Sequence, residues 1–363
     1  MLRSDAGAIY DDRASPPRTG SANIGPAPGT GRITESRMNT RSFGRTGLEV
    51  SEIAFGGGYV GGILIHADDD TKRAALRLAL DRGINWIDTA PAYGAGKSEE
   101  ALGWLLREVD ESPYLSTKVT IAADHLDDIP GQIEASLSAS LTRLGRESVT
   151  LLQLHNPIRV RAGTGALGLD NVLGQNGVAD GLDRMRRQGL TEFIGFTALG
   201  DAAACRETVA SGRFDSAQVY YNLLNPSAGR LMPQRWSGHD FGGVIDACRD
   251  HGVAVMNIRA LAAGVLATDH RTGREMPVTT QTGIAAEERR TKAVFEALGT
   301  DHGSRAQTAI RFSLANDAIA CVIVGLAELS HLEEALEAAA RGPLPAEALG
   351  RLDPVYASGF GRS

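Results

Sequence analysis

The stretch DDTKRAALRLALDRGINWIDTAPAYGAGKSEEALGWLLREV (69–109) contains one full unit of the pattern that decides the fold. Its first part has helical spacing, with Ala74, Leu78 and Ala79 on one face and a glycine cap at its end. The run INWID (84–88) is short and apolar, as expected of a buried strand. A second amphipathic segment, KSEEALGWLLREV, completes the stretch. The sequence here predicts a strand with a helix on either side.

The same unit repeats along the chain. Further buried strands are predicted at 49–55, 114–119, 149–155, 192–197, 216–221, 253–258 and 320–325. Further amphipathic helices are predicted at 130–145, 177–189, 201–212, 241–252, 285–299 and 330–342. Eight strands, each followed by a helix, predict an α/β fold of the (β/α)8 TIM-barrel type rather than a doubly wound sheet, which usually has fewer units. The segment RSFGRTGLEVS (41–51) predicts an N-terminal β-hairpin that closes the bottom of the barrel.

The two ends of the chain depart from this pattern. Residues 1–40 are rich in Pro, Gly, Ser and Arg, have no periodic apolar segment and are expected to form a disordered leader. Met38 stands directly before the regular pattern, so a start codon assigned too early is an equal alternative. The barrel is expected over 41–345, and residues 346–363 are assigned to a C-terminal tail.

The composition is that of a soluble globular protein, with 42% hydrophobic and 22% charged residues. No apolar run approaches the roughly 18 residues that span a bilayer, and a net charge of −7 gives no electrostatic reason to bind nucleic acid. Cys205, Cys248 and Cys321 are too widely spaced for a disulfide framework and indicate reduced, buried thiols. We therefore expect a cytoplasmic protein without membrane or nucleic-acid partners, and its oligomeric state stays open.

Ionisable residues close three consecutive predicted strands, at the edge where such a barrel has its active site. Asp88 ends the second strand, and Tyr93 lies in the loop that follows. Lys118 ends the third strand and His155 the fourth. Each residue alone has a structural alternative, such as a helix cap, a turn aromatic or a core histidine. Their joint placement at corresponding strand ends favours a catalytic group.

The chemistry of this group is coherent. Tyrosine has a pKa near 10, and the Lys118 ammonium would lower the pKa of Tyr93 toward the working range. Asp88 would keep Lys118 charged and oriented, and His155 would offer a second hydrogen bond to a substrate oxygen. Together the four would stabilise the oxyanion that develops when a carbonyl accepts hydride. No metal-ligand cluster or nucleophile elbow in the sequence competes with this interpretation.

The string GINWIDTAPAYGAGKSEEALGWLL resembles the signature of the aldo-keto reductases, and the resemblance extends through FGRTGLEVS, STKV and LLQLHNP over roughly residues 41–345. It implies that Tyr93 is the general acid–base and that Asp88, Lys118 and His155 complete a catalytic tetrad. It also implies a single β/α barrel that binds an extended nicotinamide cofactor without a Rossmann motif.

The resemblance further assigns residues to the cofactor. Gln218 matches a glutamine that contacts the nicotinamide amide, whereas Thr197 stands where the family usually has serine. Ile258 replaces an aromatic residue that often stacks on nicotinamide, and Arg259 would donate to the pyrophosphate, with a solvated surface arginine as the alternative. The remaining residues assigned to this part of the site are Leu261, Gly56 and Gly57. The two glycines either admit a close approach of the backbone to the cofactor or only shape a turn.

The stretch VGLAELSHLEEAL corresponds to the family's adenosine-phosphate region, where NADP-preferring members place Lys or Arg. Here Gly325 lies on the loop with Glu328 nearby, His331 replaces a common arginine, and Glu334 is retained. A carboxylate beside a phosphate is unfavourable, whereas the N-terminus of the following helix still favours an anion. The residues thus favour NAD slightly over NADP.

These features predict an NAD(P)-dependent oxidoreductase that acts on an aldehyde, ketone or sugar. The glycine-rich first loop and the preference for NAD keep open an aldose 1-dehydrogenase that works oxidatively. A non-enzymatic alternative is a binding or redox-sensing protein similar to the channel-associated β subunits. Substrate choice is expected to lie in the long loops 156–177 and 222–241.

Overall fold

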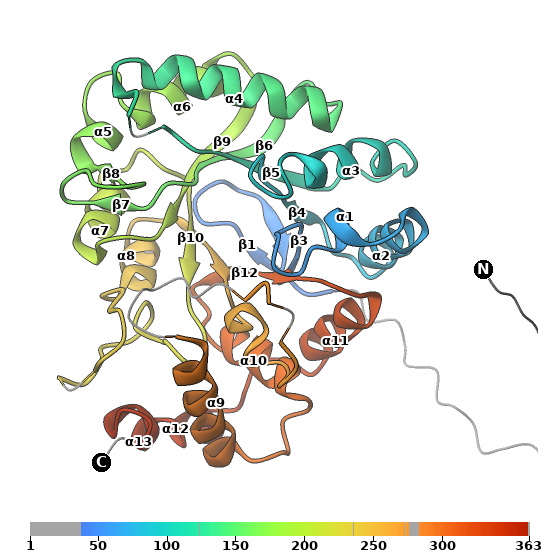
Figure 1. Ribbon diagram of the computed structural model, residues 1–363, viewed down its shortest axis with the longest axis vertical. Coiled ribbons are helices and arrows are strands. Elements are labelled where there is room, and N and C mark those ends of the chain that lie inside the picture. Colours follow the sequence, from blue (N-terminus) through green and yellow to red (C-terminus); the bar gives the residue numbers. More distant parts are fainter. Residues whose placement is uncertain (1–37, 123, 235, 272, 276–282, 362–363) are drawn as a thin grey trace, which may run out of the picture. The chain divides into compact units, whose positions relative to one another are not determined.

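The computed structural model describes residues 38–122, 124–234, 236–271, 273–275 and 283–361. Its centre is a closed barrel of eight parallel strands, which confirms the predicted fold (Figure 1). In order around the barrel these are β3 (Ile53–Gly56), β4 (Trp86–Asp88), β5 (Tyr114–Val119), β6 (Val149–Leu154), β9 (Thr191–Ala198), β10 (Ser216–Tyr220), β11 (Ala254–Ile258) and β12 (Ile319–Gly325), which pairs again with β3. We call the end at which the strands begin the bottom and the end at which they finish the top. The expected leader 1–40 lies outside the described residues up to position 37.

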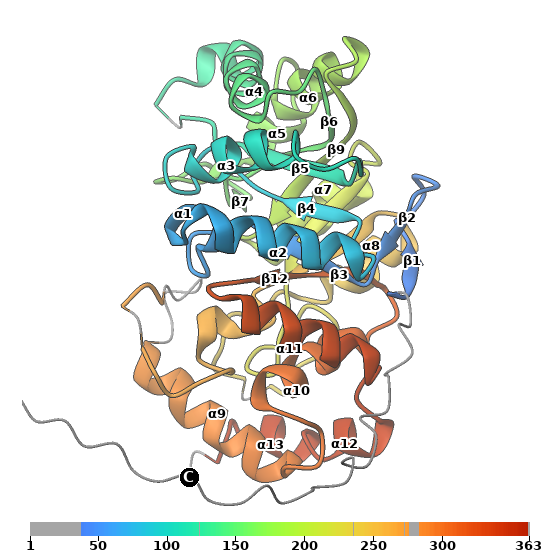
Figure 2. The same ribbon diagram turned by 90° about the vertical axis from the view of Figure 1, so that its right-hand side faces the viewer.

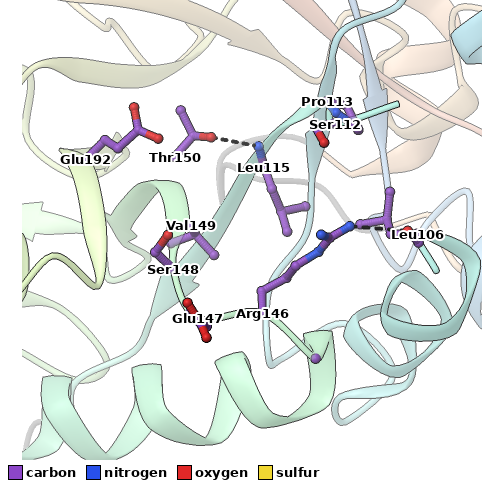
Figure 3. A pocket seen from close by; sticks show the side chains of 11 residues that line it. Leu106, Ser112, Pro113, Leu115, Arg146, Glu147, Ser148, Val149, Thr150 and Glu192 are labelled. Atoms are coloured by element: carbon purple, nitrogen blue, oxygen red, sulfur yellow. Dashed lines mark hydrogen bonds between the residues drawn. The ribbon is translucent and has the colours of Figure 1, made fainter. Parts of the chain in front are cut away.

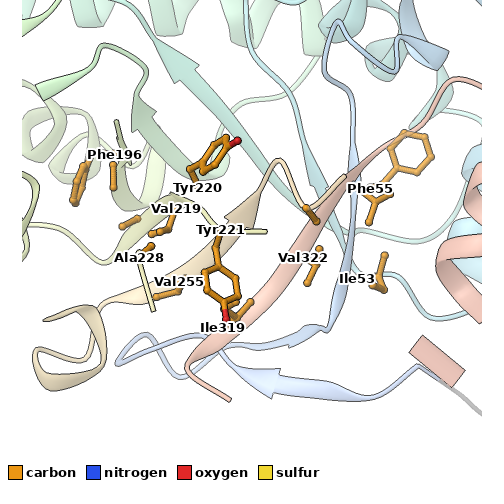
Figure 4. Packing of buried hydrophobic residues seen from close by; sticks show 14 of the residues in the cluster. Ile53, Phe55, Phe196, Val219, Tyr220, Tyr221, Ala228, Val255, Ile319 and Val322 are labelled. Carbon is orange, nitrogen blue, oxygen red and sulfur yellow. The ribbon is translucent and has the colours of Figure 1, made fainter. Parts of the chain in front are cut away.

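Alternation along each strand gives the barrel two apolar layers. Side chains that point inward form a small buried cluster inside the barrel, which includes Trp86, Leu151 and Met256. Side chains that point outward form the much larger cluster between the strands and the helices, part of which Figure 4 shows around Ile53 and Val255. The inward positions nearest the top are polar instead, and these positions build the site described below.

Helices surround the barrel and bury one face each. They are α2 (Asp69–Asp81), α3 (Lys97–Leu105), α4 (Ile129–Leu144), α6 (Val178–Arg187), α7 (Ala202–Ala210), α8 (Val244–Asp250), α10 (Arg305–Leu314) and α11 (Leu329–Ala340). Helix α2 lies between α3 and α11 (Figure 2). Its buried face consists of Ala75, Leu76 and Ala79, so the predicted face was wrong in Ala74, which is exposed, and in Leu78, which is half-buried.

The helix that precedes β12 was not predicted. The segment RAQTAIRFSL forms α10, and α9 (Ile284–Leu298), which was predicted, is an additional helix before it. Helix α10 begins with a capping box in which Ser304 and Gln307 bond each other's backbone. Every residue from Ala306 to Leu314 is buried. Its polar residues are buried as well, some with partners from distant parts of the chain: Arg311, for example, donates to the carbonyl oxygens of His302, Gly342 and Pro343.

The predicted hairpin closes the bottom of the barrel. It consists of β1 (Thr40–Ser42) and β2 (Glu49–Ser51), so the predicted strand 49–55 is divided between the hairpin and β3. Phe43, in the turn of the hairpin, is fully buried in the cluster inside the barrel and stacks on Trp86 at 4.7 Å. The hairpin therefore fills the lower opening with an aromatic side chain.

The C-terminal residues, which the sequence assigned to a tail, pack against the protein as two short helices. They form α12 (Ala346–Gly350) and α13 (Asp353–Ala357), and α13 lies beside α9. The Tyr356 side chain is buried, and its hydroxyl donates to the carbonyl oxygen of Leu223 at 3.0 Å. The remaining short elements are α1 (Ile63–His66), η1 (Leu126–Asp128), β7 (Ile158–Arg159), β8 (Leu167–Gly168), α5 (Leu169–Leu173) and η2 (Ala262–Gly264).

All three cysteines are buried free thiols, as the sequence predicted. Within the described ranges, no helix has both the length and the apolar character needed to cross a membrane.

Candidate active site

Strand alternation brings the ionisable residues together at the top of the barrel. Asp88 and Lys118 are the last inward positions of β4 and β5, and both are almost completely buried. His155 directly follows β6 and is half-buried. The rings of Tyr93 and His155 meet edge to face with their centroids 5.9 Å apart. The four residues selected from the sequence therefore form one group.

Lys118 is the centre of this group. Its Nζ donates to Asp88 Oδ2 at 2.7 Å, to the carbonyl oxygen of Thr89 at 2.9 Å and to Tyr93 Oη at 3.1 Å. An ammonium has three protons and accepts no hydrogen bond, so these contacts use its full capacity. The Tyr93 oxygen accepts from Lys118, and its own proton is left to point elsewhere.

Two turns fix the loop that carries Tyr93. The Tyr93 amide donates to Ala90, and its carbonyl oxygen accepts from the Ser98 amide at 3.3 Å. Within the second turn Gly94, Ala95 and Gly96 have left-handed backbone, and α3 begins directly after Gly96. Such a conformation is unfavourable for an alanine and is found where the surrounding structure imposes it, often at functional sites.

The pKa values follow from burial and charge together. Burial raises the pKa of Tyr93 and Asp88 adds to this effect, while Lys118 acts in the opposite direction. The expectation that Lys118 brings the pKa of Tyr93 toward neutrality was therefore wrong in its net effect. For Lys118 itself, burial opposes the charge, but Asp88 and Tyr93 outweigh it and raise the pKa. Burial and the Lys118 charge lower the pKa of His155 to about 3, so its ring is neutral at neutral pH.

Three polar residues that we did not select from the sequence contact this group. Ser116 and Gln153 lie next to Asp88, and Trp86 Nε1 donates to Ser116 Oγ at 3.0 Å. All three are fully buried. Each stands two residues before a selected residue on the same strand, so it shares the inward face. Counting back two positions from Asp88, Lys118 and His155 would have found them.

Two of the expected cofactor residues lie side by side near Asp88. Gln218 and Thr197 are register neighbours on β10 and β9. Gln218 Nε2 donates to Asp88 Oδ1 at 2.7 Å, a contact that the sequence did not predict. Thr197 is 2% exposed, and its Oγ1 has no hydrogen-bond partner among the described residues. A buried hydroxyl without a partner is unfavourable, and a bound amide group would satisfy it.

The loop after β11 carries the next expected residues. Ile258 ends β11 beside Tyr220, and Arg259 follows with left-handed backbone at φ 63°. Asn222 Nδ2 donates to the carbonyl oxygen of Arg259 at 2.9 Å and holds this conformation. Burial lowers the pKa of Arg259, while the neighbouring Tyr220 and Tyr93 oppose that shift. Arg259 therefore lies in the electrostatic environment of Tyr93, and Leu261 packs against the core two residues later.

The first-loop glycines are explained by packing. A Cβ atom on Gly56 would lie 2.6 Å from the carbonyl oxygen of Val324, and one on Gly57 would lie 2.6 Å from Ser98 Oγ. Both contacts are too short, so glycine is required there by the neighbouring β12 and α3. These contacts give both glycines a packing role, and their assignment to the cofactor site stays a prediction.

The residues expected to contact adenosine surround the start of α11. Gly325, paired with Gly56, ends β12 and is exposed, and the exposed Glu328 is the N-terminal residue before the helix. Glu328 makes no side-chain cap. His331 Nδ1 accepts from the Ala327 amide at 3.3 Å, so this ring nitrogen faces the protein's own backbone. The Glu334 side chain is half-buried one turn later.

A cavity of about 410 Å³ lies at the opposite end of the barrel. Figure 3 shows its lining at the starts of β5, β6 and β9, where Arg146 Nη2 donates to the carbonyl oxygen of Leu106. This cavity contains none of the residues discussed above. No group of three or more His, Cys, Asp or Glu side chains in the described parts of the chain is arranged to hold a metal ion.

Known proteins with similar sequences and folds agree with this geometry. The family model described as "Aldo/keto reductase family" matches residues 52–357. L-galactose dehydrogenase of Arabidopsis thaliana is 28% identical over 82% of this chain and 87% of its own length. D-threo-aldose 1-dehydrogenase of a Pseudomonas species is 27% identical over 61% of this chain and 69% of its own.

The aldo-keto reductase AKR11C1 from Bacillus halodurans, in its holo form, has a similar fold with a TM-score of 0.68 and 21% identity, over 88% of this chain and 97% of that one. The match of the family model covers most of the chain and includes all eight strands of the barrel, but not the hairpin that precedes them. The chain therefore belongs to the aldo/keto reductase family of oxidoreductases.

Proposed function

We propose that the protein transfers hydride between a nicotinamide cofactor and a carbonyl or alcohol substrate, with Tyr93 as the general acid–base. The observation that carries this proposal is the hydrogen bond from Lys118 Nζ to Tyr93 Oη. Because Tyr93 accepts that bond, its proton is available to a substrate oxygen. General acid catalysis at this position is worth roughly 10²- to 10⁴-fold in rate.

In the reductive direction Tyr93 donates its proton to the carbonyl oxygen as hydride arrives at the carbonyl carbon. Burial keeps the pKa of Tyr93 high, so the hydroxyl holds its proton at neutral pH. Lys118 stabilises the phenolate that remains, and Asp88 holds Lys118 in place. The neutral His155 ring donates a second hydrogen bond to the substrate oxygen. In the oxidative direction the Tyr93 phenolate removes the proton of the alcohol.

The polar groups at the top of the barrel fit a nicotinamide nucleotide, which supplies or accepts the hydride when bound. Thr197, whose buried hydroxyl lacks a partner in the described structure, and Gln218 would bind the amide of nicotinamide. Ile258 would cover one face of the ring, and the loop that contains Arg259 and Leu261 would hold the pyrophosphate. The start of α11 would receive the adenosine end.

We favour NAD as the cofactor, with NADP as the alternative. Glu328 is exposed beside the N-terminus of α11, where its carboxylate would repel a 2′-phosphate and accept a hydrogen bond from a 2′-hydroxyl. His331, at the position of a common arginine, directs Nδ1 to the Ala327 amide. Gly325 and Glu334 complete this end of the proposed site.

The second candidate is oxidation of an aldose at its anomeric carbon. Two relatives that match this chain are named for the oxidation of sugars, an L-galactose dehydrogenase and a D-threo-aldose 1-dehydrogenase. A hemiacetal hydroxyl would occupy the same position beside Tyr93 as a reduced alcohol, so the same proton transfer would serve both reactions.

The decisive experiment is a cofactor-dependent activity screen of the purified protein. Aldehydes and ketones would be tested with NADH and NADPH, and alcohols and free sugars with NAD and NADP. We expect turnover in at least one direction and a preference for NAD(H). Absence of turnover with every substrate class and both cofactors would contradict the proposed function and favour a binding or sensing role.

A further inference from the structure

The two oxygens of the buried Asp88 carboxylate have separate partners. Oδ2 accepts from Lys118 Nζ at 2.7 Å. Oδ1 accepts from Ser116 Oγ and from Gln218 Nε2, both at 2.7 Å, with Gln153 Nε2 farther away at 3.5 Å. Only the Oδ2 contact is needed to keep Lys118 charged, so the donors on Oδ1 require their own explanation.

Trp86 fixes the direction of the hydrogen bond from Ser116. An indole N–H can only donate, and Trp86 Nε1 donates to Ser116 Oγ at 3.0 Å. Because Ser116 Oγ accepts this bond, the hydroxyl proton of Ser116 is directed to Asp88 Oδ1. Trp86 and Ser116 are both fully buried, so water does not compete for these groups.

A buried ion pair needs such support. Removing two charges from water costs more than their attraction returns, unless the geometry is good and the remaining lone pairs are satisfied. A carboxylate held only by Lys118 could rotate and present either oxygen to Nζ. That rotation would move Nζ, whose 3.1 Å contact with Tyr93 Oη is the longest of its three hydrogen bonds. Donors on Oδ1 prevent the rotation.

We propose that Ser116, oriented by Trp86, is a positioning residue that clamps Asp88 together with Gln218 and so keeps Lys118 in contact with Tyr93. We call Trp86, Ser116 and Gln218 the Asp88 clamp. The effect of the clamp on catalytic rate rests on the function proposed above. Gln218 then serves both the cofactor amide and the tetrad, which links cofactor binding to the position of the proton donor.

The first test is independent of activity. Ser116→Ala, Gln218→Met and the double variant would be unfolded in urea. Each single variant keeps one good donor on Oδ1, whereas the double variant keeps only the distant Gln153. We expect the double variant to lower the urea midpoint by clearly more than the sum of the single effects, because losing the second donor leaves Oδ1 of a buried carboxylate without a close hydrogen-bond donor. Additive effects would overturn the clamp.

A matched control combines Gln218→Met with Ser313→Ala. Ser313 is also fully buried, but its hydroxyl lies on α10 and bonds to the Ala309 carbonyl oxygen. This pair should be additive. Super-additive loss in the control as well would overturn the assignment of the effect to Asp88.

The second test is kinetic. In Ser116→Ala, kcat for oxidation should fall about three- to tenfold at neutral pH. The pH profile of kcat should move to higher pH by about half to one unit, because the positive charge of Lys118 would stabilise the Tyr93 phenolate less. The KM for cofactor should change less than about twofold, and Ser116→Thr, which keeps the hydroxyl, should restore the profile. A wild-type pH profile in Ser116→Ala would overturn the positioning role. If the wild-type protein transfers no hydride, the proposed function fails, while the urea experiment still decides the clamp.

Discussion

The bottom and the top of the barrel use polar residues in different ways. At the bottom, Arg41 of the hairpin donates to the carbonyl oxygens of Leu314, Asn316 and Ile319. Arg45 does the same for Gly212 and Phe214 and also contacts Asp215. These contacts satisfy backbone groups at strand and helix ends, so stability alone explains them.

At the top, several features are unfavourable for the fold by itself. Lys118 is a buried cation, and Thr197 has a buried hydroxyl without a partner in the described structure. Arg259, Ala262 and Ala263 have left-handed backbone. Local violations of this kind are typical of sites kept for binding or catalysis. The buried Lys118 cation and the left-handed backbone of the loop after β11 therefore support the proposal that the functional site lies at the top of the barrel.

The largest expected effect separates two tyrosines, one at each end. Tyr93→Phe should lower kcat by roughly 10²- to 10⁴-fold without changing the melting temperature, because it removes the proton donor and keeps the ring. Tyr114→Phe, at the bottom of β5, is the matched control and should keep kcat. Steady-state kinetics and thermal melts measure both. More than about a tenth of wild-type kcat in Tyr93→Phe would contradict the tetrad.

The second effect should appear only in stability. Arg41→Met removes donors from three backbone carbonyl groups and should lower the free energy of unfolding by about 2 to 3 kcal/mol, with kcat unchanged. Arg77→Met on α2 is the control, because the ion pairs of Arg77 in the described structure are exposed, and the substitution should cost less than about 1 kcal/mol. If urea unfolding showed the same loss of free energy of unfolding in both variants, the contacts of Arg41 would not stabilise the bottom of the barrel.

The third effect concerns the adenosine end of the proposed site. Glu328→Lys should raise kcat/KM with NADP(H) relative to NAD(H) by about five- to tenfold, because a repulsive contact becomes attractive, and the gain should shrink at high salt. One substrate and both cofactors would be compared in the same buffer. Glu333→Lys, exposed on the same helix, controls for general charge. An equal shift in both variants would place Glu328 away from the ribose.

The smallest effect should have opposite signs for stability and binding. Thr197→Val replaces a buried hydroxyl that lacks a partner in the described structure, so it should stabilise the fold by up to about 1 kcal/mol while weakening cofactor binding severalfold. Thr208→Val removes a buried hydroxyl that donates to Ala204, so it should destabilise the fold and leave binding unchanged. Melting temperatures and a fluorescence titration with NADH measure both quantities. A destabilised Thr197→Val would mean that its hydroxyl is already satisfied.

Sequence periodicity predicted the barrel well because strands buried on both faces and amphipathic helices leave clear patterns. Helix α10 was missed, and the burial of its polar residues could not be predicted, because the partners of Arg311 lie as many as 32 residues away in the sequence. The position of Asp88, Lys118 and His155 could be predicted because strand ends converge at the top of the barrel. The net pKa shift of Tyr93 could not, because it depends on how much protein surrounds the ring. The contact between Gln218 and Asp88 joins positions 130 residues apart, and no local pattern in the sequence encodes it.

Hydrogen–deuterium exchange of the protein with and without NADH tests the central claim most directly, because it reports which end of the barrel binds the cofactor. We predict slower exchange on NADH binding in the loop 259–264 and in 325–334, from the end of β12 to the first turns of α11. Exchange in 145–150, which line the lower cavity, should stay the same. Protection confined to 145–150, or no protection at saturating NADH, would contradict the assignment of the cofactor and its chemistry to the top of the barrel.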